Sequence, residues 1–266
     1  MRVGLVTFNK EVTIVGDGTI DPEVVAGDKL LNQQQLQDIG HKYPLDKPIS
    51  KTGAALSKKL FALEEGGQTA LGPALLVSVS MASKYPGARV VVCTDGLANV
   101  GLGSLDRDSV RNDADRQRVE AWFEGVGNLA KLHGVAVSVI SIKGDNCALE
   151  DLGRVAEISG GEVSRVDPLE LSKNFSSILE NAVVATRVSA TMLIHQGLTF
   201  RNEVEGASKA TKEIGNVSAD SMVTFEYTLK SKDALAKFAN LKALPFQVQI
   251  TFTALNGMKC LRVISQ

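Results

Sequence analysis

Short apolar runs alternate with longer segments of helical periodicity over roughly the first 185 residues of the chain. Residues 89–94 and 135–142 are short segments rich in valine and isoleucine, typical of strands buried on both faces. Between them, apolar residues in 114–133 recur at three- and four-residue spacing, which predicts a long amphipathic helix. Strands that alternate with helices in this way predict a doubly wound, mostly parallel α/β sheet.

Other segments complete this α/β pattern. Residues 17–48 are polar and have no clear period, so we expect a surface excursion with one short helix around 28–37. The remaining predicted elements are strands at 2–7 and 11–15 forming a hairpin with a turn at Asn9-Lys10, helices at 52–65, 71–84 and 149–159, a strand at 162–166, and a final helix from Asp167-Pro168 through 184.

The pattern changes near residue 185. Residues 246–253 alternate apolar and polar side chains, which predicts a strand with one buried and one solvated face. Asn256-Gly257 then predicts a type I′ hairpin turn. Further strands are predicted at 188–194, 222–229 and 259–265, and a helix at 232–239. We therefore expect an α/β domain over residues 1–185 and a small antiparallel β-sandwich over 186–266.

Composition narrows the class of protein. A net charge of -1 gives no electrostatic reason to expect nucleic acid or an anionic membrane as a partner. The three cysteines are far apart and Cys93 lies in an apolar strand, which favours reduced thiols and a cytoplasmic protein. No apolar run approaches the roughly 20 residues of a membrane-spanning helix, and the first residues do not form a signal peptide.

Two polar residues mark the candidate site. Asp95 directly follows the strand at 89–94 and precedes Gly96, and Thr69 precedes the helix that starts near residue 71. In open α/β sheets, ligands bind where the strands end. A hard cation such as Mg²⁺ prefers oxygen ligands, so this pair is a candidate metal site. The alternative is that Thr69 caps the helix and Asp95 belongs to a turn.

Three sequence segments carry a family resemblance. VGLVTF at 3–8, GGQTALGPAL at 66–75 and VVVCTDG at 90–96 resemble a von Willebrand factor A domain. This resemblance implies a metal-ion-dependent adhesion site in which Thr69 and Asp95 are ligands. The Asp-x-Ser-x-Ser loop of that family is absent from this sequence, so we expect only weak Mg²⁺ binding. It also implies a protein partner that contacts the loop containing Gly96, Asn99 and Asp106.

Two further resemblances concern the rest of the chain. The segment FQVQITFTALNGMKCLRVIS at 246–265 resembles the β-sandwich of the COPII coat subunits. The loop DGLANVGLGSLD at 95–106 is similar to the A domain of protist circularly permuted Ras proteins, although no GTPase motif occurs in this sequence.

The von Willebrand resemblance also implies that one strand is missing. In that family the first strand lies at the sheet centre, between the strands that start here at Arg2 and Arg89. Unpaired buried backbone groups cost roughly 1–3 kcal/mol each, against a total stability of about 5–15 kcal/mol. Three solutions are open: residues preceding Met1 supply the strand, which we favour, the two flanking strands pair directly, or another chain donates a strand.

These patterns together predict a non-enzymatic protein–protein interaction module of the von Willebrand A type. The alternatives are a coat-like scaffold that needs no metal and an accessory domain of a circularly permuted Ras-type GTPase. An enzyme is the least favoured class, because no nucleophile–base pair can be named. The glycines Gly125 and Gly127 imitate a dinucleotide motif but lie inside the helix at 114–133, which excludes that motif.

Overall fold

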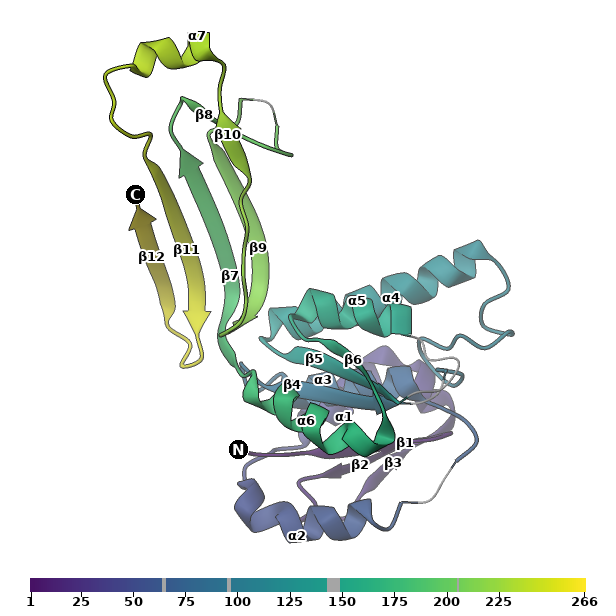
Figure 1. Ribbon diagram of the computed structural model, residues 1–266. Helices are drawn as coiled ribbons and strands as arrows, with labels where there is room; N and C mark the ends of the chain where they lie inside the picture. The colour runs from purple at the N-terminus through teal and green to yellow at the C-terminus, as the bar shows by residue number, and fades with distance from the viewer. Residues whose placement is uncertain (64–65, 95–96, 143–148, 205) are drawn as a thin grey trace. The chain divides into compact units, whose positions relative to one another are not determined.

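The computed structural model describes residues 1–63, 66–94, 97–142, 149–204 and 206–266 (Figure 1). The chain folds as two compact units, Met1–Glu180 and Asn181–Gln266. Two of the buried hydrophobic clusters lie wholly within the first unit and a third lies wholly within the second. Each unit therefore has its own core.

The first unit contains a parallel sheet made of β4 (Arg89–Thr94), β5 (Ala136–Ile142) and β6 (Val163–Val166) in that spatial order. Successive strands are joined through α4 (Asp113–Leu132) and α5 (Leu149–Ser159), as parallel strands require. The predicted α/β class is confirmed, and the helices at 114–133 and 149–159 are found within one residue of their predicted bounds.

A second, antiparallel sheet precedes it in the chain. It consists of β1 (Leu5–Phe8), β2 (Val12–Gly16) and β3 (Glu23–Val25), with β2 in the middle. The predicted hairpin is confirmed, with Phe8 opposite Val12. The alternative that the two strands flanking the missing one pair directly is wrong, because β1 and β4 belong to separate sheets.

Helix α3 (Leu71–Ala82) connects the two sheets through a shared core. Eleven of its twelve residues are buried, so this helix is apolar all round rather than amphipathic. Pro73 is accommodated because it falls in the first turn, where its missing N–H has no intrahelical partner to lose. Residues of β2, β4 and β5 pack with α3 in one continuous cluster.

The prediction of a surface excursion over residues 17–48 is wrong. This segment forms β3, the 3₁₀ helix η1 (Gly27–Leu31) and α1 (Gln33–Lys42), and it buries Leu30, Leu36 and Ile39. A helical period is present in these apolar positions, but the glutamines between them lower the mean hydropathy and obscure it. The segment is part of the main core, where α1 packs on α3.

Two predicted helices differ at their ends. Helix α2 (Ile49–Leu60) begins three residues before the predicted start at 52 and ends before the predicted end at 65. The predicted helix from 167 through 184 is a 3₁₀ turn, η2 (Pro168–Glu170), followed by α6 (Leu171–Glu180). Val183 instead begins a strand, because it is buried in the sheet of the second unit.

The second unit is an antiparallel β-sandwich with a four-stranded sheet, in the order β12-β11-β7-β9, and a two-stranded sheet of β10 and β8. Strand β11 is present as predicted, and its Phe246 and Val248 pack against the core beside Ile194 and Met192. The predicted alternation of buried and solvated positions is not seen, because all residues of β11 except Thr251 are half-buried. The strands are β7 (Val183–Ile194), β8 (Leu198–Phe200), β9 (Lys209–Ser218), β10 (Tyr227–Leu229), β11 (Phe246–Ala254) and β12 (Lys259–Ser265).

Sequence patterns missed part of this unit. Strands β8 and β9 were not predicted, β8 because it is only three residues long and β9 because its sequence KATKEIGNVS is mostly polar. The predicted strand at 222–229 is reduced to β10, and the predicted helix at 232–239 is α7 (Lys232–Leu235) followed by η3 (Ala236–Phe238).

The β11–β12 hairpin is not closed by the predicted type I′ turn. The Gly257 N–H donates to the Ala254 carbonyl at 2.8 Å, and Gly257 has a φ of +85° while Asn256 has no positive φ. This is a type I turn followed by a glycine bulge, which needs a left-handed residue only at the glycine. Asn256 instead accepts a hydrogen bond from the Met258 N–H through its side chain.

Candidate functional site

Thr69 and Asn99 are bonded to each other where β4 ends and α3 begins. The Thr69 N–H donates to the Asn99 side-chain oxygen at 2.7 Å, and the Asn99 N–H donates to the Thr69 carbonyl at 3.1 Å. This reciprocal pair joins two segments that are 30 residues apart in sequence. The segment before α3 and the loop after β4 are therefore held in a fixed relation.

The residue that follows β1, Asn9, is hydrogen-bonded to the start of α3 beside Thr69. The Ala70 N–H donates to the Asn9 carbonyl at 2.7 Å, and the Asn9 side chain closes its own turn by accepting from the Glu11 N–H at 3.0 Å. Helix α3 has no side-chain cap, so the Asn9 carbonyl satisfies one of the backbone donors that a helix leaves free at its start.

The loop after β4 is packed against the helices. Ala98 is fully buried and its carbonyl accepts from the Leu105 N–H at 2.8 Å, while the Leu102 N–H donates to the Leu30 carbonyl at 3.0 Å. Gly103 lies so close to Trp122 that a Cβ atom at this position would be 2.7 Å from the indole ring. Residues 98–105 of this loop are therefore packed closely against η1 and α4.

Asp106 lies at an exposed turn of this loop. Its N–H donates to the buried Ser104 hydroxyl at 3.3 Å, and its carbonyl accepts from the N–H groups of Ser109 and Val110, both at 2.9 Å. The backbone of Asp106 is thus fixed on both sides while the residue is exposed to solvent. We call Thr69, Asn99 and residues 97–110 together the α3–β4 edge.

The structure brings two of the predicted site residues together and leaves the others apart or undescribed. Thr69 and Asn99 are in contact, and Asp106 lies further along the same loop. Asp95 and Gly96, the predicted second ligand and its neighbour, lie outside the described residues.

The described donors at the α3–β4 edge do not by themselves fit a metal ion. The Asn99 side-chain oxygen, a natural Mg²⁺ ligand, already accepts the Thr69 N–H. Within the described ranges, no group of three or more His, Cys, Asp or Glu side chains is arranged to hold a metal.

Sequence patterns did not reveal an ion cluster between α4 and α5. Arg116 contacts Asp151 at 2.8 Å, Glu120 at 3.2 Å and Glu150 at 3.8 Å, and Asp151 is almost completely buried. The hydrogen bond to Asp151 is the main reason that the pKa of Arg116 is raised. The four-residue spacing of Arg116 and Glu120 was the available sequence signal. A guanidinium that is already paired with three carboxylates serves the packing of α4 on α5 and leaves no free charge for a ligand.

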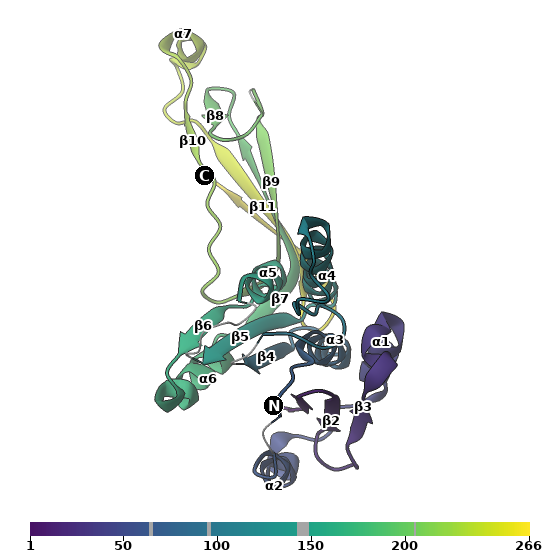
Figure 2. The same ribbon diagram turned by 90° about the vertical axis from the view of Figure 1, so that its right-hand side faces the viewer.

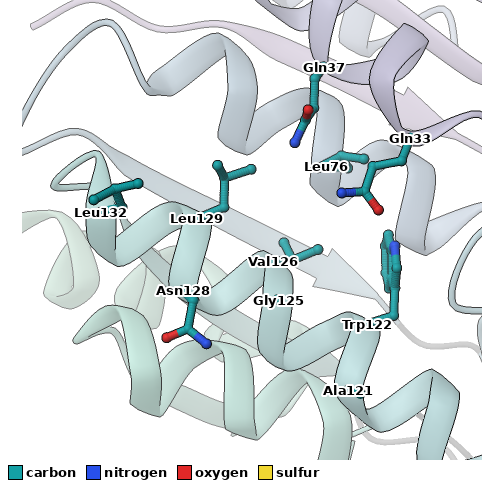
Figure 3. Close-up of a pocket in the computed structure, with 10 residues that line it drawn as sticks. All are labelled: Gln33, Gln37, Leu76, Ala121, Trp122, Gly125, Val126, Asn128, Leu129 and Leu132. Atoms are coloured by element: carbon teal, nitrogen blue, oxygen red, sulfur yellow. The ribbon is translucent and has the colours of Figure 1, made fainter.

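A shallow groove of about 390 Å³ lies between α1 and α4, above Leu76 of α3 (Figure 3). Figure 3 shows Gln33 of α1 next to Trp122 of α4, whose buried indole N–H has no hydrogen-bond partner among the described residues. The groove is lined by Gln33, Gln37, Leu76, Ala121, Trp122, Gly125, Val126, Asn128, Leu129 and Leu132. None of these side chains titrates near neutral pH, so the groove offers an apolar surface with an amide rim and no acid or base.

Comparison with solved structures defines the fold. The human COPII-coat protein Sec24c matches with a TM-score of 0.67 and 14% identity, covering 99% of this chain and 37% of that one. A von Willebrand factor type A protein from Catenulispora acidiphila matches with a TM-score of 0.54 and 16% identity, covering 98% of this chain and 56% of that one. The chain therefore has a von Willebrand A-type α/β fold joined to a β-sandwich, an arrangement also found in the COPII coat protein.

No family model matches the chain. Comparison with curated sequences does find a relative. The chain is 36% identical over 270 residues to Circularly permutated Ras protein 1 from Dictyostelium discoideum. The alignment covers 99% of this chain and 31% of the relative, so the chain spans about a third of the length of the curated protein that it matches. Among the described residues, no helix is long and apolar enough to cross a lipid bilayer.

Proposed function

We propose that this chain is a non-enzymatic protein–protein interaction module that contacts its partner through the α3–β4 edge. The observation that carries the proposal is the reciprocal pair of hydrogen bonds between Thr69 and Asn99. The von Willebrand A-type fold and the similarity to a circularly permuted Ras protein support it.

The packing of the edge suits a binding role. Loops held on a rigid scaffold are common binding elements, and a loop that is already ordered loses little conformational entropy when it binds. The buried Ala98 and Ser104 hold this loop, while Asp106 is exposed beside them. The edge therefore presents a preformed polar surface.

The proposal also includes a specific feature of this surface, a weak site for Mg²⁺. Thr69 and Asp95 are the residues that would hold Mg²⁺, and the ion would supply positive charge to an acidic side chain of the partner. Two protein ligands leave most of the coordination shell to water, so we expect low affinity.

Two other functions remain as alternatives. A coat-like scaffold would bind its partner without metal, and the fold shared with the COPII coat protein favours it. An accessory domain of a circularly permuted Ras-type GTPase would bind the rest of such a protein, and the similarity to the Dictyostelium protein favours that role.

One binding experiment separates these functions. The probe is the remaining two thirds of the Dictyostelium relative, produced as a separate protein and titrated onto this chain by biolayer interferometry with Mg²⁺ or with EDTA. We expect measurable binding that the double variant Asn99→Ala, Asp106→Ala weakens at least tenfold, because it unlocks the loop and removes its exposed carboxylate. Asp220→Ala, at an exposed position of the second unit, is the matched control and should bind as the parent does.

The metal dependence gives a second readout. If Mg²⁺ takes part, EDTA and the variant Asp95→Ala should weaken binding by the same factor, and their effects should not add. If binding survives EDTA but is lost in the Asn99→Ala, Asp106→Ala variant, the chain binds its partner as a scaffold that needs no metal. Binding that none of these changes affects excludes the α3–β4 edge as the contact surface.

A further inference from the structure

The turn between β11 and β12 contains Asn256, the one asparagine of the chain that precedes a glycine. Asn256 and Gly257 are both exposed, and the flanking Leu255 and Met258 are 45% and 59% exposed. A Cβ atom at Gly257 would meet no other atom within 4 Å. Figure 1 shows this turn at one end of the four-stranded sheet, and Figure 2 shows α7 at the other end of the same unit. Water therefore reaches the turn freely.

The turn holds the Asn256 side chain against the main chain that follows it. The Met258 N–H donates to the Asn256 Oδ1 at 3.1 Å. The ring that this hydrogen bond closes contains both the Asn256 Cγ and the Gly257 nitrogen. Because Gly257 has no side chain, nothing on its own residue obstructs the approach of these two atoms.

The same hydrogen bond favours a reaction at the side-chain amide. Asparagine amides are among the thermally labile groups of proteins. Nucleophilic attack on the Asn256 Cγ places negative charge on Oδ1, and the Met258 N–H already points at that oxygen. A backbone donor in this position stabilises the developing charge. The turn thus combines an amide carbon, an unhindered nitrogen and a donor for the oxygen.

We propose that Asn256 is a site of spontaneous deamidation in the folded protein. The Gly257 nitrogen loses its proton to hydroxide and forms a bond to the Asn256 Cγ, and the bond from Cγ to Nδ2 breaks. The Nδ2 group leaves as ammonia after taking up a proton from solvent. Water then opens the cyclic imide, giving aspartate when it attacks the side-chain carbonyl and isoaspartate when it attacks the main-chain carbonyl. Hydroxide and water are the only co-reactants.

One hydrogen bond of the turn slows this reaction. The Gly257 N–H donates to the Ala254 carbonyl at 2.8 Å, so its proton is held until that bond opens. Exposed turns open locally at a much smaller free-energy cost than a whole domain unfolds. The reaction therefore proceeds through opening of the turn and does not require the second unit to unfold.

The isoaspartate product changes the hairpin itself. It adds one carbon atom to the main chain at residue 256, inside the turn. The turn is closed by the Ala254 N–H, which donates to the Met258 carbonyl at 2.9 Å, and Thr253 pairs with Lys259 just beyond it. Among the described residues β12 pairs only with β11. We therefore expect a longer turn to loosen β12.

Peptide mass spectrometry after incubation of the chain at mildly alkaline pH measures the conversion of each asparagine. Asn9 is the matched internal control, because its Oδ1 also accepts the N–H two residues ahead, from Glu11 at 3.0 Å, but the next residue is Lys10. We expect Asn256 to convert at least tenfold faster than Asn9. Equal rates at the two asparagines overturn the proposal.

A destabilised variant shows whether the folded turn is the reacting state. Leu198→Ala weakens the core of the second unit, so a reaction that needs this unit to unfold would become more than tenfold faster. Reaction through the turn alone proceeds at the same rate in the parent and in the variant. Acceleration in Leu198→Ala would therefore overturn deamidation of the folded protein.

Hydrogen exchange tests the effect on β12. The isoaspartate form is separated by ion-exchange chromatography and compared with the parent and with Asn256→Asp, which has the new charge but an unchanged main chain. We expect residues 259–265 to exchange at least tenfold faster in the isoaspartate form alone, while β9, at the other edge of the sheet, is unchanged. Equal exchange of residues 259–265 in all three proteins contradicts the loosening of β12.

Discussion

Tyr43 directly follows α1, and its buried hydroxyl is hydrogen-bonded to the carboxylate of Glu23 in β3. Its O–H donates to the Glu23 carboxylate at 2.7 Å, and burial, followed by this hydrogen bond, raises the pKa of the phenol above its ordinary value of 10. A raised folded pKa means that the contribution of Tyr43 is complete below about pH 10 and is lost as the pH rises toward the folded value. We predict that Tyr43→Phe lowers the unfolding free energy by about 1 kcal/mol at pH 7.

The pH dependence distinguishes this role from simple packing. Urea unfolding measured from pH 7 to 11 should show a smaller alkaline loss of stability in Tyr43→Phe than in the parent, because the variant has no phenol to ionise at this site. Tyr227→Phe, at an exposed position, is the control and should follow the parent curve. Identical alkaline slopes in the parent and in Tyr43→Phe would contradict the assignment.

Between elements, the contact of α1 with α3 depends on Gly40. A Cβ atom at this position would lie 2.6 Å from the Val77 carbonyl oxygen and 2.7 Å from the Ser80 Cβ. The helices can approach this closely only because Gly40 has no side chain. We predict that Gly40→Ala destabilises the fold by roughly 1–3 kcal/mol, since overpacking outweighs the gain of up to about 1 kcal/mol in helix propensity.

A second helical glycine serves as the matched control. At Gly53 of α2 the nearest atom to a built Cβ is 3.8 Å away, so the same substitution adds no clash. Gly53→Ala should therefore stabilise the protein by about 0.5–1 kcal/mol in urea unfolding. If both alanine variants changed stability in the same direction, the close approach of α1 to α3 would not be what selects glycine.

At the scale of the whole molecule, two separate cores predict two unfolding transitions. Val79 belongs to the core of Met1–Glu180, and Leu198 belongs to the core of Asn181–Gln266. We predict that calorimetry resolves two transitions and that Leu198→Ala, which removes about 2–5 kcal/mol of packing, lowers only one of them. Val79→Ala should lower only the other. A single transition that both variants shift equally would refute the independence of the two cores.

The α/β class followed from local patterns alone. Helices α4 and α5 and strands β5, β11 and β12 have strong periodicity or alternation, and these signals depend only on neighbouring residues. Thr69 could be assigned to the start of a helix and Asn99 to the loop after a strand for the same reason, whereas the hydrogen bonds between these two residues could not be predicted.

Only the tertiary structure decided which polar segments belong to the core and which strands pair with one another. The segment with α1 is mostly polar, but three spaced apolar residues suffice once α3 offers a surface on which to bury them. Strand β9 has little strand signal of its own and is ordered by pairing with β7. Strands β1 and β4 belong to different sheets and are more than 80 residues apart in the sequence. Local patterns do not extend over that distance, so only the fold determines whether two such strands pair.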